Sequence, residues 1–245
     1  KPTTLQRKIE KFLSQGESIP GIAGKIADIW YPRIFEDRIA VCIRAGGLEY
    51  IISRKGDNPW QKILSQGESI PGIEGKITAI WYPSIFEDRI AVSISEAGGL
   101  GYIISRKGDN PWQKLLSQGE PIPGIAGEIT DIRYPSIFED RIAVSISEAG
   151  GLGYIISRKG DNPWQKLISE GESIPGIAGK ITDISWSPSI FEDRIAVRIS
   201  AGGLEHLIIG SNLGPEIVSV SLLSPPLPKE AQEEPLSPPS EKKFT

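Results

Sequence analysis

The chain repeats itself with a period close to 52 residues, and this repeat limits the folds open to it more than any other feature. The tryptophan of the motif "ISRKGDNPW" returns at equal intervals, at Trp60, Trp112 and Trp164. Four copies of a longer unit begin at Lys25, Lys76, Glu128 and Lys180. A repeat of this length is typical of a fold built from identical small modules that bury their apolar surface against one another.

Each unit contains four short apolar segments rich in Ile, Val, Trp and Tyr, as β-strands are. In the second unit they cover residues 77–82, 89–94, 100–105 and 112–117. Pro, Gly and Glu-Asp turns separate them too closely for long helices. Four strands in about 52 residues are typical of a propeller blade. A β-solenoid coil, or a short helix in "NPWQKLLSQGE", is the alternative.

The polar turn before each tryptophan resembles the Asp box, or BNR repeat, of sialidase-like, sortilin-like and photosystem II assembly factor-like propellers. The family pattern is Ser-x-Asp-x-Gly-x-x-Trp, but Lys107 occupies the Asp place and Asp109 the Gly place, so the box is degenerate. The resemblance implies a propeller in which the boxes are structural turns away from the active face. The predicted box residues are Ser53, Asp57, Trp60, Ser105, Asp109, Trp112, Ser157, Asp161 and Trp164.

The units predict an all-β fold, a four-bladed or partial larger β-propeller. Two segments compete for the outer strand of the last blade: residues 8–21, which match the sequence around Trp60, and "EIVSVSL" at 216–222. The better match favours the N-terminal segment, with the C-terminal one as an extra edge strand. We therefore expect an N-terminal arm at 1–7, a propeller at 8–223 and a disordered Pro-rich tail at 224–245.

Composition argues against several classes of function. The net charge of −4 gives no basic footprint for nucleic acid. One cysteine, Cys42, and one histidine, His206, predict no metal site and no cofactor. No apolar run is long enough to span a membrane as a helix. The chain begins at Lys1 rather than Met, so we expect a missing start; secretion stays open and no compartment is predicted.

The first strands of a propeller line its centre, so variable polar and aromatic residues there are the predicted ligand contacts. Aromatic rings beside acidic groups suit sugar recognition by stacking and hydrogen bonding. The alternative is that the tryptophans pack between blades and the acids bond to neighbouring turns. The predicted ligand residues are Asp28, Asp131, Asp183, Trp30, Trp81, Arg133, Arg44, Glu96, Glu148 and Arg198.

Near-identical units present like groups at every blade, whereas a catalytic centre needs unlike groups at one place. The sequence therefore predicts no catalytic residue and favours a binding or scaffold module that recognises a protein or glycan through repeated sites. A BNR-type glycoside hydrolase and a photosystem-assembly-like scaffold are the alternatives. The repeated Glu-Asp-Arg turns, such as 87–89, are interpreted as ion pairs between blades. Homo-oligomers could form by blade exchange or ring completion.

Overall fold

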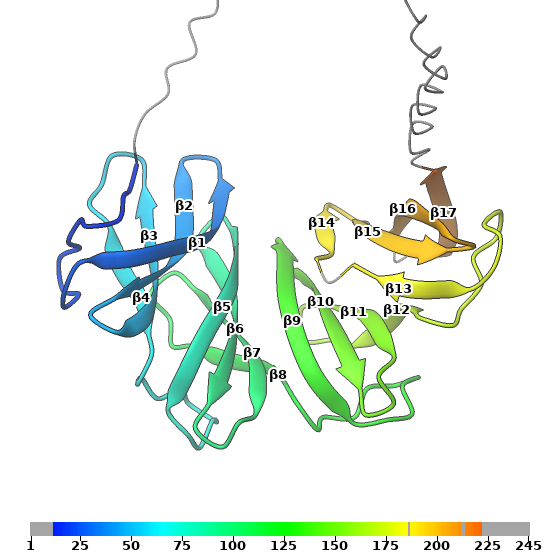
Figure 1. Ribbon diagram of the computed structural model, residues 1–245, viewed down its shortest axis with the longest axis horizontal. Helices are drawn as coiled ribbons and strands as arrows, with labels where there is room; N and C mark the ends of the chain where they lie inside the picture. Colours follow the sequence, from blue (N-terminus) through cyan, green and yellow to red (C-terminus); the bar gives the residue numbers. More distant parts are fainter. Residues whose placement is uncertain (1–11, 186, 212–213, 222–245) are drawn as a thin grey trace, which may run out of the picture.

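The computed structural model describes residues 12–185, 187–211 and 214–221, and these residues form strands and no helix. The strands make four antiparallel sheets that follow one another around a centre (Figure 1). The chain is therefore all-β, with the blade organisation of a β-propeller, as its repeat predicts. The predicted arm at 1–7 and tail at 224–245 lie outside the described residues.

Each blade is a meander in which strands pair in chain order from the centre outward, except that the first strand of blade 4 is in two pieces that both pair with the next strand. Blade 1 consists of β1 (Ile26–Phe35), β2 (Arg38–Ala45), β3 (Leu48–Lys55) and β4 (Gln61–Ser65). Blade 2 consists of β5 (Ile77–Phe86), β6 (Arg89–Glu96), β7 (Gly101–Lys107) and β8 (Gln113–Ser117). Blade 3 consists of β9 (Ile129–Phe138), β10 (Arg141–Glu148), β11 (Gly153–Lys159) and β12 (Gln165–Ser169). Blade 4 consists of β13 (Ile181–Ile184), β14 (Ser189–Phe191), β15 (Arg194–Ala201), β16 (Leu204–Ser211) and β17 (Gly214–Ser221).

In blades 1 to 3 the first strand is longer than the sequence predicted, whereas in blade 4 it is divided into β13 and β14. The expected strand at 77–82 continues through Pro83 to Phe86, which leaves only Glu87 and Asp88 in the turn. The pairing register shifts between Trp81 and Ser84, so the proline lies at an irregularity. Proline is tolerated there because the first strand is a sheet edge and one of its amides needs no ladder partner.

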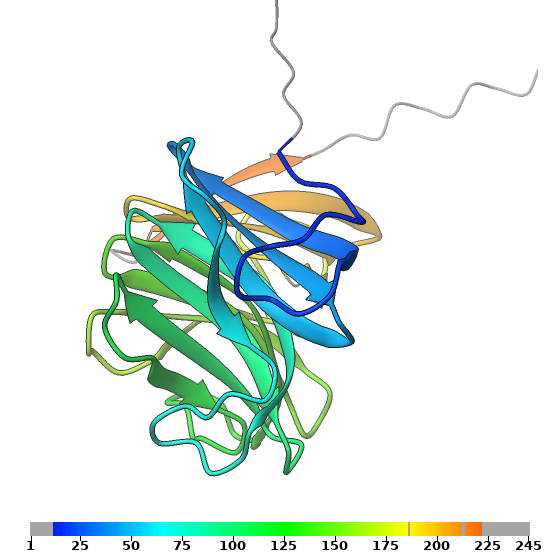
Figure 2. The same ribbon diagram turned by 90° about the vertical axis from the view of Figure 1, so that its left-hand side faces the viewer.

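The outer strand of blade 4 differs from the prediction. β17, from the C-terminal segment, pairs with β16, so residues 8–21 do not close this blade. Residues 8–11 lie outside the described residues. Residues 12–24 lie against blade 1 instead (Figure 2). There Gly16 N donates to Ile26 O at 2.8 Å, as Gly67 N does to Ile77 O at the next blade. Residues 12–24 thus pack like the loop that enters each of the following blades.

Apolar cores fill the joins between successive blades. Separate buried clusters lie between blades 1 and 2, 2 and 3, and 3 and 4. A fourth cluster packs Ile19 and Ile22 of the N-terminal segment against Val41 and Tyr50 of blade 1. The fold is therefore stabilised mainly where one sheet faces the next.

Arginines from the Glu-Asp-Arg turns cross each of these joins. Arg38 Nη1 donates to Glu87 O at 2.9 Å, and Arg89 Nη1 donates to Glu139 O at 3.0 Å. Arg141 Nη1 donates to Asp193 O, also at 3.0 Å. The predicted contact between blades exists, but its acceptor is a backbone carbonyl rather than a carboxylate. Burial lowers the pKa of Arg89 from its usual value.

The predicted box turns have a structural part in the joins. The rings of Trp112 and Trp164 are buried, and Trp164 Nε1 donates to Leu115 O of the preceding blade at 3.3 Å. Trp60 makes the equivalent bond to Phe12 O of the N-terminal segment. The box serines Ser53, Ser105 and Ser157 are buried, whereas the box acids Asp57, Asp109 and Asp161 are exposed. The tryptophan thus anchors the start of each outer strand to its neighbour.

Candidate functional site

The first strands of the four blades surround a central cavity of about 530 Å³. It is lined by their C-terminal halves, from Arg33 and Phe35 in blade 1 to Ser187 and Phe191 in blade 4. Phenylalanines form a row around it. Ring centroids lie 4.5 Å apart for Phe35–Phe86 and Phe86–Phe138, and 5.1 Å apart for Phe138–Phe191. The cavity is therefore lined by aromatic rings together with serine side chains and Arg33.

A row of three tyrosines precedes these phenylalanines on the first strands, and one of them, Tyr134, lines the cavity. Tyr31 and Tyr82 have ring centroids 4.5 Å apart, and Tyr82 stacks on Tyr134 at 3.9 Å. All three adopt the left-handed conformation, with φ of 55°, 51° and 52°. Such conformations are uncommon for bulky residues and occur where the surrounding structure imposes them. Partial burial and hydrogen bonds with the two neighbouring hydroxyls raise the pKa of Tyr82, so it is a neutral phenol at physiological pH.

Sequence reasoning did not single out these tyrosines. The signal that could have found them is the Tyr-Pro dipeptide at 31–32, 82–83 and 134–135. The fourth unit has Ser187-Pro188 instead, so the aromatic row ends at blade 3. The four blades therefore do not present identical groups to the centre.

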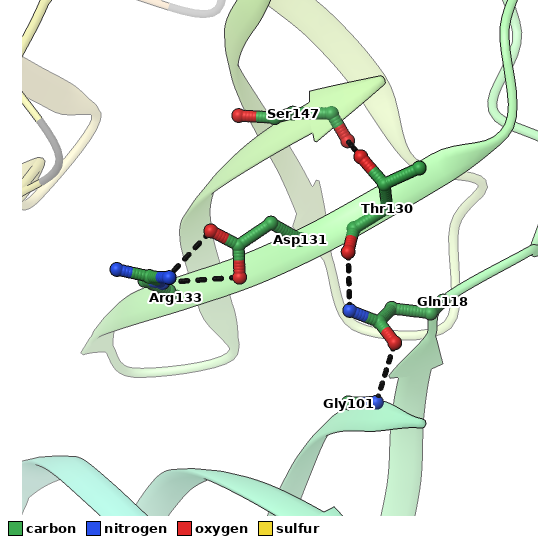
Figure 3. Close-up of polar contacts among 6 residues, drawn as sticks. All are labelled: Gly101, Gln118, Thr130, Asp131, Arg133 and Ser147. Carbon is green, nitrogen blue, oxygen red and sulfur yellow. Dashed lines mark hydrogen bonds and ion pairs between the residues drawn. The ribbon is translucent and has the colours of Figure 1, made fainter. Parts of the chain in front are cut away.

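The predicted ligand residues on the first strands lie toward the other, N-terminal halves of those strands. Arg133 Nε lies 2.8 Å from Asp131 Oδ2, and both side chains point to the same side of β9 (Figure 3). Partial burial alone would lower the pKa of Arg133, but the hydrogen bond and charge of Asp131 raise it. In blade 1 the same strand position pairs Asp28 with Arg44. The equivalent Asp183 of blade 4 is exposed.

The two predicted tryptophans lie on sheet faces. Trp30 packs against the core between blades 1 and 2, with the Arg44 guanidinium 5.8 Å from its ring centre. Trp81 is half-buried opposite Ser93 of β6. Neither side chain lines the central cavity. Trp30 therefore packs between two blades, which is the alternative to ligand contact that the sequence left open.

The remaining predicted ligand residues belong to turns and to the open face of blade 4. Glu96 is buried and accepts a hydrogen bond from Gly98 N at 2.8 Å. Glu148 is buried and accepts one from Gly127 N at 3.0 Å. Arg198 is exposed and lies 3.3 Å from Glu205. The structure thus brings together the Asp131–Arg133 and Asp28–Arg44 pairs but does not gather the ten residues into one pocket.

Two equivalent grooves lie between blades on the face that carries the Glu-Asp-Arg turns. The groove between blades 2 and 3 has a volume of about 470 Å³, and the one between blades 3 and 4 about 190 Å³. Each is lined by the Phe-Glu-Asp-Arg turn and a lysine of one blade, Lys107 or Lys159, and by the acids of the next blade. Each groove therefore presents hydrogen-bond donors, acceptors and one aromatic ring to a ligand.

The described residues contain no cluster of His, Cys, Asp and Glu that could hold a metal ion. Over the same residues, nothing in the structure is a helix of the length and apolarity that a membrane crossing requires.

Comparisons with known proteins do not place the chain in a family. No protein-family model matches it, and no curated protein matches it in sequence. Among solved structures it is similar to the SapL1 lectin in complex with alpha methyl fucoside, with a TM-score of 0.46 and 16% identity over 78% of this chain and 61% of that one. The BP39L lectin from Burkholderia pseudomallei has a TM-score of 0.41 and 11% identity, over 74% of this chain and 52% of that one. The GH43_1 enzyme from Xanthomonas citri complexed with xylotriose has a TM-score of 0.39 and 10% identity, over 80% and 73%.

Proposed function

We propose that the chain is a non-catalytic binding module that recognises a glycan through repeated grooves between its blades. The observation that carries this proposal is that the grooves beside Lys107 and Lys159 share a Phe-Glu-Asp-Arg turn, a lysine and the Glu-Asp pair of the next blade in the same order, although the groove beside Lys107 is larger. Lysine and carboxylate groups can bond to several hydroxyls of a sugar, and a phenylalanine ring can contact its apolar face. Weak sites repeated on one rigid body gain affinity for a branched or repeating ligand.

The acidic and aromatic residues on the N-terminal halves of the first strands are proposed as a second contact region. A degenerate Asp box remains our interpretation of the turns before Trp60, Trp112 and Trp164. Hydrolysis is less well supported, because the paired acids recur in every blade and lie next to each other in a turn. A glycosidase instead needs two carboxylates at a defined separation across one sugar bond.

A glycan array followed by isothermal titration with any ligand found tests the proposal. We expect more than one equivalent site per chain. We expect affinity to fall at least about tenfold when Lys107→Ala and Lys159→Ala are combined, since two charged hydrogen bonds are lost. Lys25→Ala is the matched control, because Lys25 is exposed and lies outside both grooves.

Three results would contradict the proposal. The first is a single-site isotherm, and the second is capture of one protein partner without any glycan signal. The third is turnover of a fluorogenic glycoside that is lost in a variant of the paired acids, which would favour the hydrolase.

A further inference from the structure

The three joins within the chain share one set of contacts. A phenylalanine of one blade meets the phenylalanine of the next, and an arginine crosses to a turn carbonyl, as Arg89 does to Glu139 O. In the last two joins a serine hydroxyl also accepts from a backbone amide of the following blade: Ile137 N donates to Ser84 Oγ at 3.1 Å, and Ile190 N to Ser136 Oγ at 3.1 Å. Every join thus needs a forward face on one blade and a matching rear face on the next.

Blade 1 has a rear face whose inner part is uncovered. Ile34 has 69% of its surface exposed, whereas its equivalents Ile85, Ile137 and Ile190 have 7%, 4% and 7% exposed because the preceding blade covers them. The outer part of this face is already covered by the N-terminal segment through Ile19 and Ile22. An exposed isoleucine at a position that is buried in every other blade indicates a missing neighbour.

Blade 4 has the complementary forward face. Phe191 is 63% exposed, whereas Phe86 is 8% exposed. Ser189 and Arg194 are exposed too, and they occupy the places from which Ser136 and Arg141 bond to the following blade. Among the described residues, no hydrogen bond joins blade 4 to blade 1, and their strands make marginal contact at most.

We propose that blade 4 of one copy of this chain docks head-to-tail on blade 1 of a second copy, and thereby repeats the internal join. Phe191 then meets Phe35, Arg194 donates to the carbonyl of Glu36, and Ile34 N donates to Ser189 Oγ. A second copy is the occupant because its faces already have the required residues in the required order. This inference does not depend on the proposed binding function.

Blades 1 and 4 of one chain do not form this join with each other in the structure. Blades 1 and 4 face each other across the open side of the arc, although the chain tethers them (Figure 1). The other three joins are formed, whereas the fourth stays open in this structure. Repeating one heterologous contact either closes a ring or extends an open array.

One substitution makes the proposed join weaker than the internal ones. Arg198 occupies the position of Cys42, Ser93 and Ser145, small side chains that are 0%, 1% and 2% exposed in the formed joins. A bulky cation there has to leave the contact or be desolvated. Association is therefore reversible, and Arg198→Ser strengthens it.

Sedimentation and light scattering of the full chain over a range of concentrations test the proposal. The wild type should show a reversible mass increase, and Arg198→Ser should shift it to at least about tenfold lower concentration. Ile34→Asp and Arg194→Glu should each abolish it. Leu100→Asp is the control, since Leu100 is 46% exposed on a turn outside the two faces and should not change association.

Mixing Ile34→Asp with Arg194→Glu distinguishes a head-to-tail contact from a symmetric one. Each variant has one intact face, so the mixture should form a pair through the single unaltered join while either variant alone stays monomeric. A wild type that is monomeric up to millimolar concentration overturns the proposal. So does a mass increase that neither variant reduces, or a mixture that does not associate. Monomers whose melting temperature falls with Ile34→Asp would show that the chain closes on itself instead.

Discussion

At the scale of single residues, Cys42 lies in the join between blades 1 and 2, so the reactivity of its thiol measures whether that join is packed. Its side chain is 0% exposed, and its Sγ lies 3.4 Å from Ile80 O of the neighbouring blade. Burial, together with the charge of Glu49, raises the pKa of this thiol to about 12. A thiol reagent at neutral pH should therefore leave native Cys42 unmodified and react only as urea unfolds the chain, with both transitions at the same midpoint. Rapid labelling without denaturant would contradict this packing.

A second residue-scale prediction compares two arginines at the same position of the repeat. Arg89 donates to Glu139 O and to Ser105 Oγ, whereas Arg194 is exposed and bonds to no described residue. We expect Arg89→Ala to lower the free energy of unfolding by about 2 kcal/mol, since charged hydrogen bonds are lost. Arg194→Ala should change it by less than about 0.5 kcal/mol. Urea denaturation under monomeric conditions measures both values, and equal costs would argue against the assigned joins.

At the scale of elements, the sequence predicted the number and order of strands well because Gly, Pro and Glu-Asp turns recur at fixed positions. It did not predict which segment completes blade 4. Residues 8–21 match the repeat better, but β17 follows β16 directly, so the loop to be closed is short and costs little entropy. The tyrosine row was not predicted for another reason. Its residues adopt a left-handed conformation at a strand irregularity, and the spacing of apolar residues in the sequence does not indicate such a conformation.

Because the N-terminal segment packs on blade 1 rather than blade 4, its deletion should destabilise blade 1. Deleting residues 1–24 removes Ile19 and Ile22 from the cluster that covers Val41 and Tyr50. Burial of two isoleucines is worth roughly 3 kcal/mol or more, so the loss should be of that order. Hydrogen exchange should accelerate in β2 and β3. Acceleration confined to blade 4 would instead support the closure that the sequence suggested.

The loop that enters blade 4 gives a prediction about pH. Burial alone would raise the pKa of Glu172, but hydrogen bonds from Lys166 and Ser169 outweigh it and lower the pKa below the usual range. A carboxylate with a lowered folded-state pKa stabilises the fold above its unfolded-state pKa, and this stability is lost as the pH falls through the folded-state value. Thermal melts of Glu172→Gln between neutral and acid pH should therefore depend less on pH than those of the wild type. Lys166→Met should weaken the dependence in the same direction, and an unchanged slope in both variants would rule out the assigned contact.

At the scale of the whole molecule, stability should follow the number of joins that each blade makes. Blades 2 and 3 pack against neighbours on both faces, whereas blade 4 packs on one face and has no tryptophan in its sequence at the place of Trp60, Trp112 and Trp164. In a linear array of modules, an end module opens without disturbing those that remain packed. Amides of β15 and β16 should therefore exchange at least about tenfold faster than those of β6 and β10 in dilute protein, which corresponds to a difference of about 1.4 kcal/mol in the free energy of local opening.

If copies dock head-to-tail, raising the protein concentration should slow exchange in β15 and beside Ile34 while leaving β6 and β10 unchanged, because only the end faces gain a neighbour. Uniform exchange across the four blades would mean that the chain unfolds as one unit and that its open side carries no local weakness.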